Sequence, residues 1–174
     1  MKVSFIVAVY CVEKYIGQCI ESLQNQDGMR DTEIILVDDG SQDRSGEICD
    51  SYARLASRIT VIHQENQGLS AARNNGLQFA AGKYIAFING DDAVTPEYLE
   101  ILYSEAEKSG ADFAFYDYAK TEADQRSVPE PCREHPADII QNSIIHSQLS
   151  KKSRFPVFRM GKTFPQRLPR RCAV

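Results

Sequence analysis

The sequence has no long hydrophobic run and no closely paired cysteines. Its longest apolar stretch, residues 5–12, is too short to span a bilayer. The N-terminus lacks the small-residue cleavage site of a signal peptide, so residues 3–10 suit a first strand better. The five cysteines are odd in number and form no Cys-x-x-Cys pair, which argues against a disulfide framework and a thiolate metal site. With 174 residues and 43% hydrophobic content, the chain is typical of a one-domain cytoplasmic protein.

The common glycine-rich nucleotide motifs are also missing. No Gly-x-Gly-x-x-Gly follows the first strand, which disfavours a nicotinamide or flavin dinucleotide site. No Gly-x-x-x-x-Gly-Lys-Ser/Thr occurs, which excludes a P-loop. The absence of Gly-x-Ser-x-Gly weighs against an α/β-hydrolase.

Acidic residues are absent from the basic tail, residues 151–174, which carries 8 bases and a charge of +8. Residues 1–150 hold all 24 acids against 12 bases, a net charge of −12. The tail could be a basic arm for membrane lipid or nucleic acid, or it could simply be solvated. Its proline and arginine content predicts an irregular segment.

Strand and helix patterns alternate between residues 3 and 118. The second apolar run, residues 33–37, has no polar alternation, which is typical of strands covered on both faces of a parallel sheet. This order predicts an α/β fold with a mainly parallel sheet flanked by helices. The expected strands are residues 3–10, 33–37, 59–63, 84–88 and 111–118, and the expected helices are residues 12–26, 43–56, 69–81 and 96–109.

Polar residues follow three of these strands, where ligands bind in such sheets. The three strand exits are Tyr10-Cys11, Asp38-Asp39 and the acidic turn, residues 89–92. One acidic pair could be a solvated turn, but two pairs at one sheet edge indicate a site. Asp38 or Asp39 could accept an N–H of a base, and the acidic turn could hold a divalent cation that bridges a diphosphate. Arg73 could reach the base or the phosphates, and an exposed helix arginine is an equal alternative.

Four ordered segments resemble the family 2 glycosyltransferases, and the resemblance covers residues 1–118. It implies a GT-A (Rossmann-like) nucleotide-sugar-binding core, with residues 119–150 beginning an incomplete acceptor-side region before the basic tail. The matching segments are residues 3–16, 35–43, 66–76 and 84–92, the last continued by residues 96–100.

The resemblance implies an inverting transfer of a sugar from a nucleoside diphosphate donor to an acceptor hydroxyl. The donor would be a UDP-sugar, and the acceptor a saccharide or lipid-linked molecule in surface polysaccharide or glycoconjugate synthesis. The enzyme would be cytoplasmic, at the inner face of the membrane through peripheral association, without a nucleic-acid partner. Mn²⁺ or Mg²⁺ would bind Asp91 and Asp92. The implied nucleotide-binding residues are Ala8, Tyr10, Asp38, Asp39, Arg73, Asn89 and Gly90.

The chain departs from the family pattern at two places. Asn89 stands where the family usually has Asp, so that metal affinity is expected to fall. The family base is a carboxylate after an Arg-Phe-Pro segment, but no Asp or Glu follows Pro156 here. Asp138 is the one carboxylate in residues 135–174, and its position before Ile139 suggests a helix start. The catalytic base is therefore unassigned, and we expect nucleotide-sugar binding with poor transfer.

Two other functions are consistent with these observations to different degrees. The first is a catalytically silent nucleotide-sugar-binding fragment, because the base is missing. The second is a nucleotidyltransferase, which would share the sheet and the metal chemistry. That class is disfavoured, because the first strand ends in Tyr10-Cys11-Val12-Glu13 rather than a glycine-rich basic loop.

Overall fold

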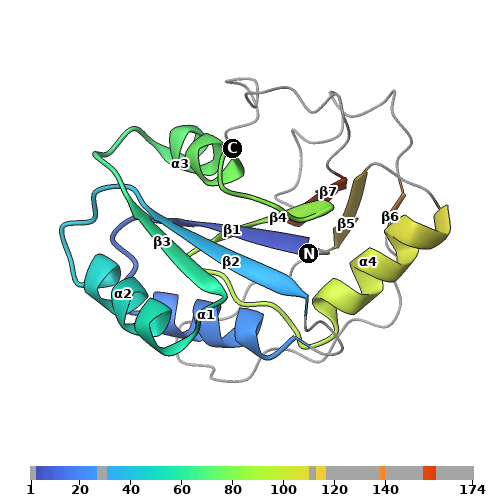
Figure 1. Cartoon of the computed structure of the whole chain (residues 1–174), viewed down its shortest axis with the longest axis horizontal. Coiled ribbons are helices and arrows are strands. Elements are labelled where there is room, and N and C mark those ends of the chain that lie inside the picture. Colours follow the sequence, from blue (N-terminus) through green and yellow to red (C-terminus); the bar gives the residue numbers. More distant parts are fainter. Residues whose placement is uncertain (1–2, 27–30, 110–112, 117–137, 140–154, 160–174) are drawn as a thin grey trace.

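The computed structural model describes residues 3–26, 31–109, 113–116, 138–139 and 155–159. These residues form seven strands in one sheet, with four helices packed on it (Figure 1). The strands are β1 Val3–Val9, β2 Thr32–Asp38, β3 Ile59–His63, β4 Tyr84–Asn89, β5 Phe113–Tyr116, β6 Asp138–Ile139 and β7 Phe155–Arg159. The helices are α1 Ile16–Gln24, α2 Ser45–Leu55, α3 Leu69–Leu77 and α4 Tyr98–Ser109.

The sheet has the order β3-β2-β1-β4-β7-β5-β6. Its first four strands pair in parallel, β1 with β2 and β4, and β2 with β3. The predicted α/β fold with a mainly parallel sheet is therefore confirmed. Helix α1 begins four residues later than expected, because the amide nitrogens of Tyr15 and Ile16 both donate to the carbonyl of Val12 in a preceding turn.

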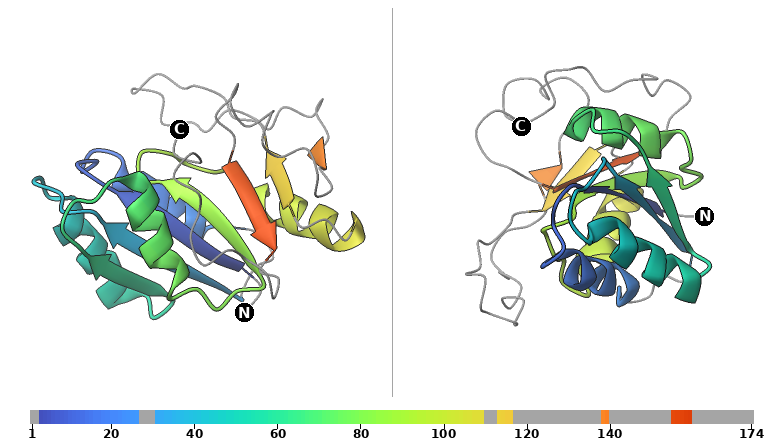
Figure 2. Two further views of the ribbon diagram at one scale, coloured as in Figure 1. Left: turned by 90° about the horizontal axis from the view of Figure 1, so that it is seen from above. Right: turned by 90° about the vertical axis from the view of Figure 1, so that its left-hand side faces the viewer.

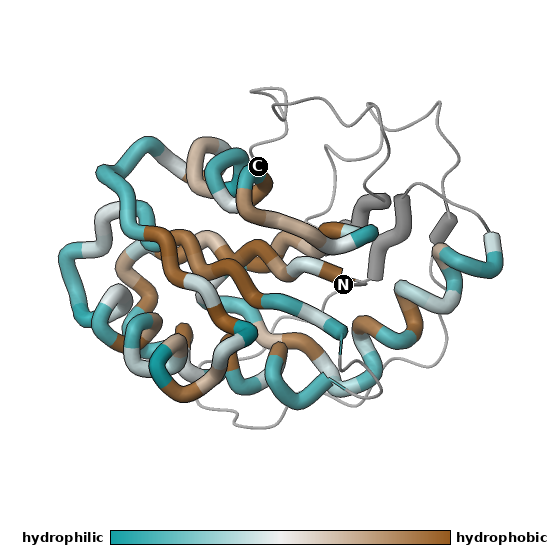
Figure 3. Tube along the Cα trace, in the orientation of Figure 1, coloured by the Kyte–Doolittle hydropathy of each residue, from teal (hydrophilic) through white to brown (hydrophobic). Residues whose placement is uncertain are grey.

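Both faces of the parallel strands are buried, because alternate side chains point to opposite sides of a strand. Phe5, Val7 and Val9 of β1 join one core with α1, α2 and α4, whereas Ile6 packs toward α3 in a second core. Figures 1 and 2 show α3 on one face of the sheet and the other described helices on the opposite face, and Figure 3 shows the apolar strands between the helical layers. A Cβ on Gly76 of α3 would lie 2.5 Å from Ile6 Cγ2, so α3 packs directly against the sheet.

The strand register brings the carboxyl ends of four strands to one edge. Asp38 at the end of β2 pairs with Val9 of β1 on one side and with His63 of β3 on the other. Asn89 at the end of β4 pairs with Ala8 of β1. The three polar exits expected from the sequence therefore leave the same edge of the sheet.

The alternation of side chains also divides these residues between the two faces. Asn89 follows Ile85 and Phe87 at a spacing of two and shares their α3 face. Asp38 follows Ile34 and Leu36 at the same spacing and shares the α2 face. The sheet edge thus has two polar groups, one under each helical layer.

Strand β7 corrects the expectation that the basic tail is irregular throughout. Phe155–Arg159 pairs antiparallel with both β4 and β5. The β4 ladder covers Val157 to Arg159 and ends before Pro156, which has no N–H to donate. The rest of the tail lies outside the described residues.

Asp138 does not begin a helix, which corrects a second expectation. It forms strand β6 with Ile139 and pairs antiparallel with Phe115 of β5. A β-branched residue such as Ile139 suits a strand better than a helix start. The remainder of the expected acceptor-side region, residues 119–150, lies outside the described residues.

Candidate functional site

The loop after β1 is held by hydrogen bonds from the loop after β2. The backbone N–H of Cys11 donates to Ser41 Oγ at 3.0 Å, and that of Val12 donates to Ser45 Oγ at 2.9 Å. Cys11 has a φ of 51°, a left-handed conformation that is uncommon outside glycine. The fixed loop leaves Tyr10 50% exposed at the sheet edge, where its ring is free to contact a ligand.

Asp39 is buried, with 3% of its surface exposed, and connects β2 to the start of α3. Its Oδ1 accepts from Gln64 Nε2 at 2.6 Å and from the Gln67 N–H at 2.9 Å. Its Oδ2 accepts from the N–H of Gly68, the N-cap of α3, at 2.8 Å. A carboxylate has about four acceptor positions, so Asp39 retains about one for a ligand N–H.

Asp38 makes its contacts on the α2 face. Its Oδ1 accepts from the Ser41 N–H at 3.1 Å, and its Oδ2 lies 2.9 Å from His63 Nδ1. The other ring nitrogen of His63, Nε2, lies 3.1 Å from Asp50 Oδ1. Hydrogen bonds from the His63 ring to Asp38 first, and then to Asp50, raise the pKa of His63 above its ordinary value of 6.5. Both ring nitrogens donate only in the imidazolium form, so the protonated ring bridges β2 and α2.

This bridge predicts a pH-dependent stability. Because the folded pKa of His63 is raised, its contribution is fully present below about pH 6.5 and is lost as the pH rises through the folded pKa. The side chain is 49% exposed, so we expect less than about 1 kcal/mol, or about 2–4 °C in melting temperature. Melting curves of wild type and His63→Gln between about pH 5.5 and 8.5 test this. A melting-temperature difference between the two proteins that stays constant across this pH range contradicts the prediction. In Asp50→Asn, which keeps only the bond to Asp38, the pH-dependent part of the stabilisation should be about half that of wild type.

Arg73, Asn89 and Asp92 form a chain of hydrogen bonds on the α3 face. Arg73 Nη2 donates to Asn89 Oδ1 at 2.9 Å, and Asn89 Nδ2 donates to Asp92 Oδ2 at 2.9 Å. The guanidinium carbon lies 5.6 Å from the centre of the Phe87 ring, a cation–π distance. Burial lowers the pKa of Arg73 and raises the pKa of Asp92. Arg73 Nε is buried and has no hydrogen-bond partner among the described residues, so this group carries one unsatisfied donor.

The acidic turn is held against β1 by its glycine. The Gly90 N–H donates to the Ala8 carbonyl at 2.9 Å, and a Cβ on Gly90 would lie 2.9 Å from Val12 Cγ2. A larger residue would push the turn away from the strand. Gly90 and Ala8 therefore shape the site through their backbones, and leave Asp91 exposed and Asp92 half-buried beside it.

Asp91 and Asp92 are the carboxylates of the acidic turn that could hold a divalent cation. Among the residues that the structure describes, no group of three or more His, Cys, Asp or Glu side chains could hold a metal. Mg²⁺ is commonly bound by one or two carboxylates together with substrate phosphates, so two adjacent carboxylates beside an arginine suit that mode. Arg73 is linked to Asp92 through Asn89 and places a positive charge beside this turn.

The predicted residues thus lie at one sheet edge in separate groups. Arg73, Asn89 and Asp92 are joined on the α3 side, Asp38 bonds toward α2, and Asp39 anchors the 64–68 loop. Gly90 is bonded to Ala8 between these groups, and Tyr10 is exposed after β1. Sequence reasoning missed Ser41, Ser45, His63 and Gln64, which hold the loops around them. The hydroxyls of Ser41 and Ser45 were recognisable as turn and helix-start residues after Asp38-Asp39.

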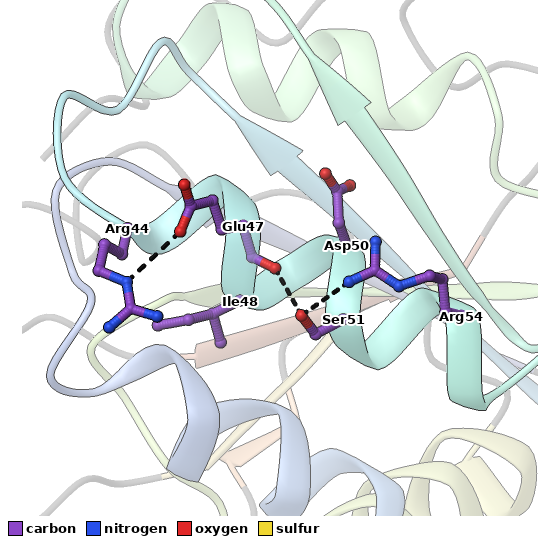
Figure 4. Close-up of a pocket in the computed structure, with 6 residues that line it drawn as sticks. All are labelled: Arg44, Glu47, Ile48, Asp50, Ser51 and Arg54. Carbon is purple, nitrogen blue, oxygen red and sulfur yellow. Dashed lines mark hydrogen bonds and ion pairs between the residues drawn. The ribbon is translucent and has the colours of Figure 1, made fainter.

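A shallow groove of about 340 Å³ lies elsewhere, along the outer surface of α2 (Figure 4). Its charged groups are already partnered, since Arg44 pairs with Glu47 at 3.4 Å and Arg54 Nη2 donates to Ser51 Oγ at 3.0 Å. Ligand sites usually gather polar groups from several elements, whereas this groove is formed by one helix and its preceding residue. The sheet edge is therefore the better candidate. The groove is lined by Arg44, Glu47, Ile48, Asp50, Ser51 and Arg54.

No helix in the described part of the chain has the length and apolar character needed to cross a membrane.

The chain matches known proteins along most of its length. A sequence profile of the family described as Glycosyl transferase family 2 matches residues 4–163. The chain is 47% identical to glycosyltransferase EpsJ of Bacillus subtilis over 129 residues, 74% of this chain and 37% of EpsJ. It is 37% identical over 128 residues to the minor teichoic acid biosynthesis protein GgaB of the same species, 72% of this chain and 13% of GgaB. The chain thus spans well under two thirds of either relative.

A solved structure extends the comparison to the fold. TarS residues 1–349 from S. aureus, in complex with UDP-GlcNAc, superimposes with a TM-score of 0.72 and 26% sequence identity. The match covers 91% of this chain and 45% of the TarS chain. The likeness confirms the GT-A fold that the sequence motifs implied.

Proposed function

Because this chain belongs to glycosyl transferase family 2, we propose that it binds a nucleoside diphosphate sugar and transfers the sugar to an acceptor hydroxyl with inversion. The observation that carries this proposal is the junction of Arg73, Asn89 and Asp92 at the carboxyl edge of the sheet. A half-buried arginine whose Nε has no partner among the described residues, linked through Asn89 to Asp92 of the acidic turn, suits a diphosphate bound together with a cation.

Each part of the sheet edge has a role in this proposal. Tyr10 lines the base pocket with its exposed ring, and either Asp38 or Asp39 accepts an N–H of the base. Arg73 binds the diphosphate. Asp91 and Asp92 hold Mn²⁺ or Mg²⁺, which stabilises the charge that develops on the leaving diphosphate.

The donor, acceptor and location are proposed from the relatives and from the charge of the tail. A UDP-sugar is favoured because the TarS structure contains UDP-GlcNAc, and polysaccharide synthesis because GgaB is a teichoic acid biosynthesis protein. A saccharide or lipid-linked acceptor fits such a process. The basic tail, with its charge of +8, would attract the anionic inner face of the membrane and favour peripheral association in the cytoplasm.

UDP with Mn²⁺ is expected to raise the melting temperature of the chain. A ligand at about 100 times its Kd stabilises the folded state by about 2.7 kcal/mol, which corresponds to about 5–10 °C here. A thermal-shift series with UDP, UDP plus Mn²⁺, and Mn²⁺ alone measures it. Asp91→Ala should remove the Mn²⁺-dependent part of the shift and keep the metal-free part. No shift with millimolar UDP, with or without Mn²⁺, rejects the proposed function.

A binding protein without transferase activity is the second candidate. It is favoured by one observation, that no Asp or Glu occurs from residue 139 to residue 174. A positioned general base contributes about 10²–10⁴-fold, so a chain without one would bind the donor and transfer it slowly. Turnover of UDP-sugars with a panel of acceptors, measured beside TarS, separates the two candidates.

A further inference from the structure

Asn89 makes two hydrogen bonds that together determine how its amide is oriented. An arginine has only donors and an ionised carboxylate only acceptors, so Asn89 Oδ1 must face Arg73 and Nδ2 must face Asp92. Both distances are 2.9 Å. Reversing the amide would set two donors against each other and two acceptors against each other. Asn89 is therefore a directional connection between helix α3 and the acidic turn.

The neutrality of Asn89 has a consequence for both neighbours. A carboxylate at the end of β4 would pair with the guanidinium of Arg73 directly, whereas the amide orients this group and leaves its charge for another partner. The same amide donates an N–H to Asp92 Oδ2, so that oxygen is already hydrogen-bonded. Because the amide is neutral, Asn89 also does not provide a third carboxylate beside Asp91 and Asp92. Both effects weaken cation binding relative to anion binding at this edge.

The unpartnered donor of Arg73 shows which anion would benefit. Arg73 Nε is buried and has no hydrogen-bond partner in the described part of the chain. Its Nη2 is held by Asn89, and the ring of Phe87 lies beneath the guanidinium. A diphosphate oxygen would satisfy this donor at little cost in side-chain ordering, because the side chain is already held.

We propose that Asn89 is a positioning residue that directs Arg73 toward the diphosphate and makes most of the nucleotide affinity independent of the divalent cation. The inference rests on the proposed function. It adds how much of the nucleotide affinity comes from Arg73 and how much from the divalent cation.

Replacement of Asn89 by the isosteric aspartate tests this division. In Asn89→Asp, Arg73 would pair with the new carboxylate, and Asp91 and Asp92 would gain a third acidic neighbour. Calorimetric titrations with UDP in EDTA should show about a tenfold loss of affinity relative to wild type. With Mn²⁺ present, the UDP affinity of Asn89→Asp should return close to that of wild type. The ratio of UDP affinity with Mn²⁺ to UDP affinity in EDTA should therefore be about tenfold higher in Asn89→Asp than in wild type.

Asn89→Ala is the matched control, because it removes both hydrogen bonds without adding a charge. Asn89→Ala should bind UDP about tenfold more weakly than wild type in EDTA. The ratio of its UDP affinities with Mn²⁺ and with EDTA should stay at the wild-type value. Should Asn89→Asp fail to fold, unchanged metal-free affinity in Asn89→Ala would by itself overturn the proposal. A purely structural Asn89 would change the melting temperature of both variants and leave the affinity ratio at the wild-type value in both, which also overturns it.

A titration with Mn²⁺ alone separates this inference from the proposed function. If wild type binds no UDP in either condition, the proposed function fails, but Asn89→Asp should still bind Mn²⁺ about tenfold more tightly than wild type. Equal Mn²⁺ affinity in the two proteins overturns the inference about Asn89, whatever the nucleotide result.

Discussion

Asp39→Ala is expected to destabilise the protein by about 3–5 kcal/mol and to abolish measurable UDP binding. The carboxylate is 3% exposed and accepts three hydrogen bonds, two of them from the backbone N–H groups of Gln67 and Gly68. Alanine would leave these donors unsatisfied in a buried place. It would also remove a negative charge from the N-terminus of α3, whose N-cap Gly68 has no side chain to cap the helix.

Urea unfolding of wild type, Asp39→Ala and Asp39→Asn measures this effect. The asparagine oxygen can keep the hydrogen bonds from Gln64 and Gln67, but its NH₂ group then faces the Gly68 N–H, so an intermediate loss of about 1.5–3 kcal/mol is expected. Asp91→Ala is the control, because Asp91 is exposed and its removal should leave stability unchanged. An Asp39→Ala protein as stable as wild type would show that the 64–68 loop does not depend on this carboxylate.

The sequence was sufficient to predict the parallel half of the fold and its polar edge. Residues 34–37 and 84–88 are continuous apolar runs, which are typical of strands buried on both faces. Parallel strands bring their carboxyl ends to one edge, so polar residues after three such runs had to converge. The register confirms this for Asp38 and Asn89, which both pair with the end of β1.

The antiparallel half was not predictable in the same way. Strand β7 has a proline at its second position and pairs with β4, about 70 residues earlier in the chain. A local pattern contains no information about such a distant partner, and proline usually argues against an interior strand. Asp138 was similarly misassigned, because an acid before two isoleucines suits both a helix start and an edge strand.

The internal hydrogen bonds of the site were also beyond the sequence. Asp38 and Asp39 were predicted as alternatives for one task, but their side chains follow opposite directions at the end of β2. Asp38 contacts His63 toward α2, whereas Asp39 holds the loop before α3. Adjacent residues at a strand end are separated in this way because alternate side chains leave opposite faces.

Arg73→Gln is expected to weaken UDP binding by about 10–100-fold, with and without Mn²⁺, and to change stability little. Arg73 Nε is buried and has no partner among the residues that the structure describes, so the folded protein gains little from this side chain in the absence of an anion. Its removal costs the hydrogen bond to Asn89 Oδ1 and the contact with Phe87. Arg73→Gln should therefore lower the free energy of UDP binding by more than it lowers the free energy of unfolding.

Arg44→Gln is the matched control for this prediction, because Arg44 lies in the α2 groove and pairs with Glu47 there. Calorimetry with UDP should give wild-type affinity for Arg44→Gln in both metal conditions, and melting curves should verify that both variants fold. The opposite result, with UDP binding lost in Arg44→Gln and kept in Arg73→Gln, would move the nucleotide site from the sheet edge to the surface of α2. Equal losses in both variants would indicate that UDP binds by net charge rather than at a formed site, since long-range attraction does not distinguish two arginines.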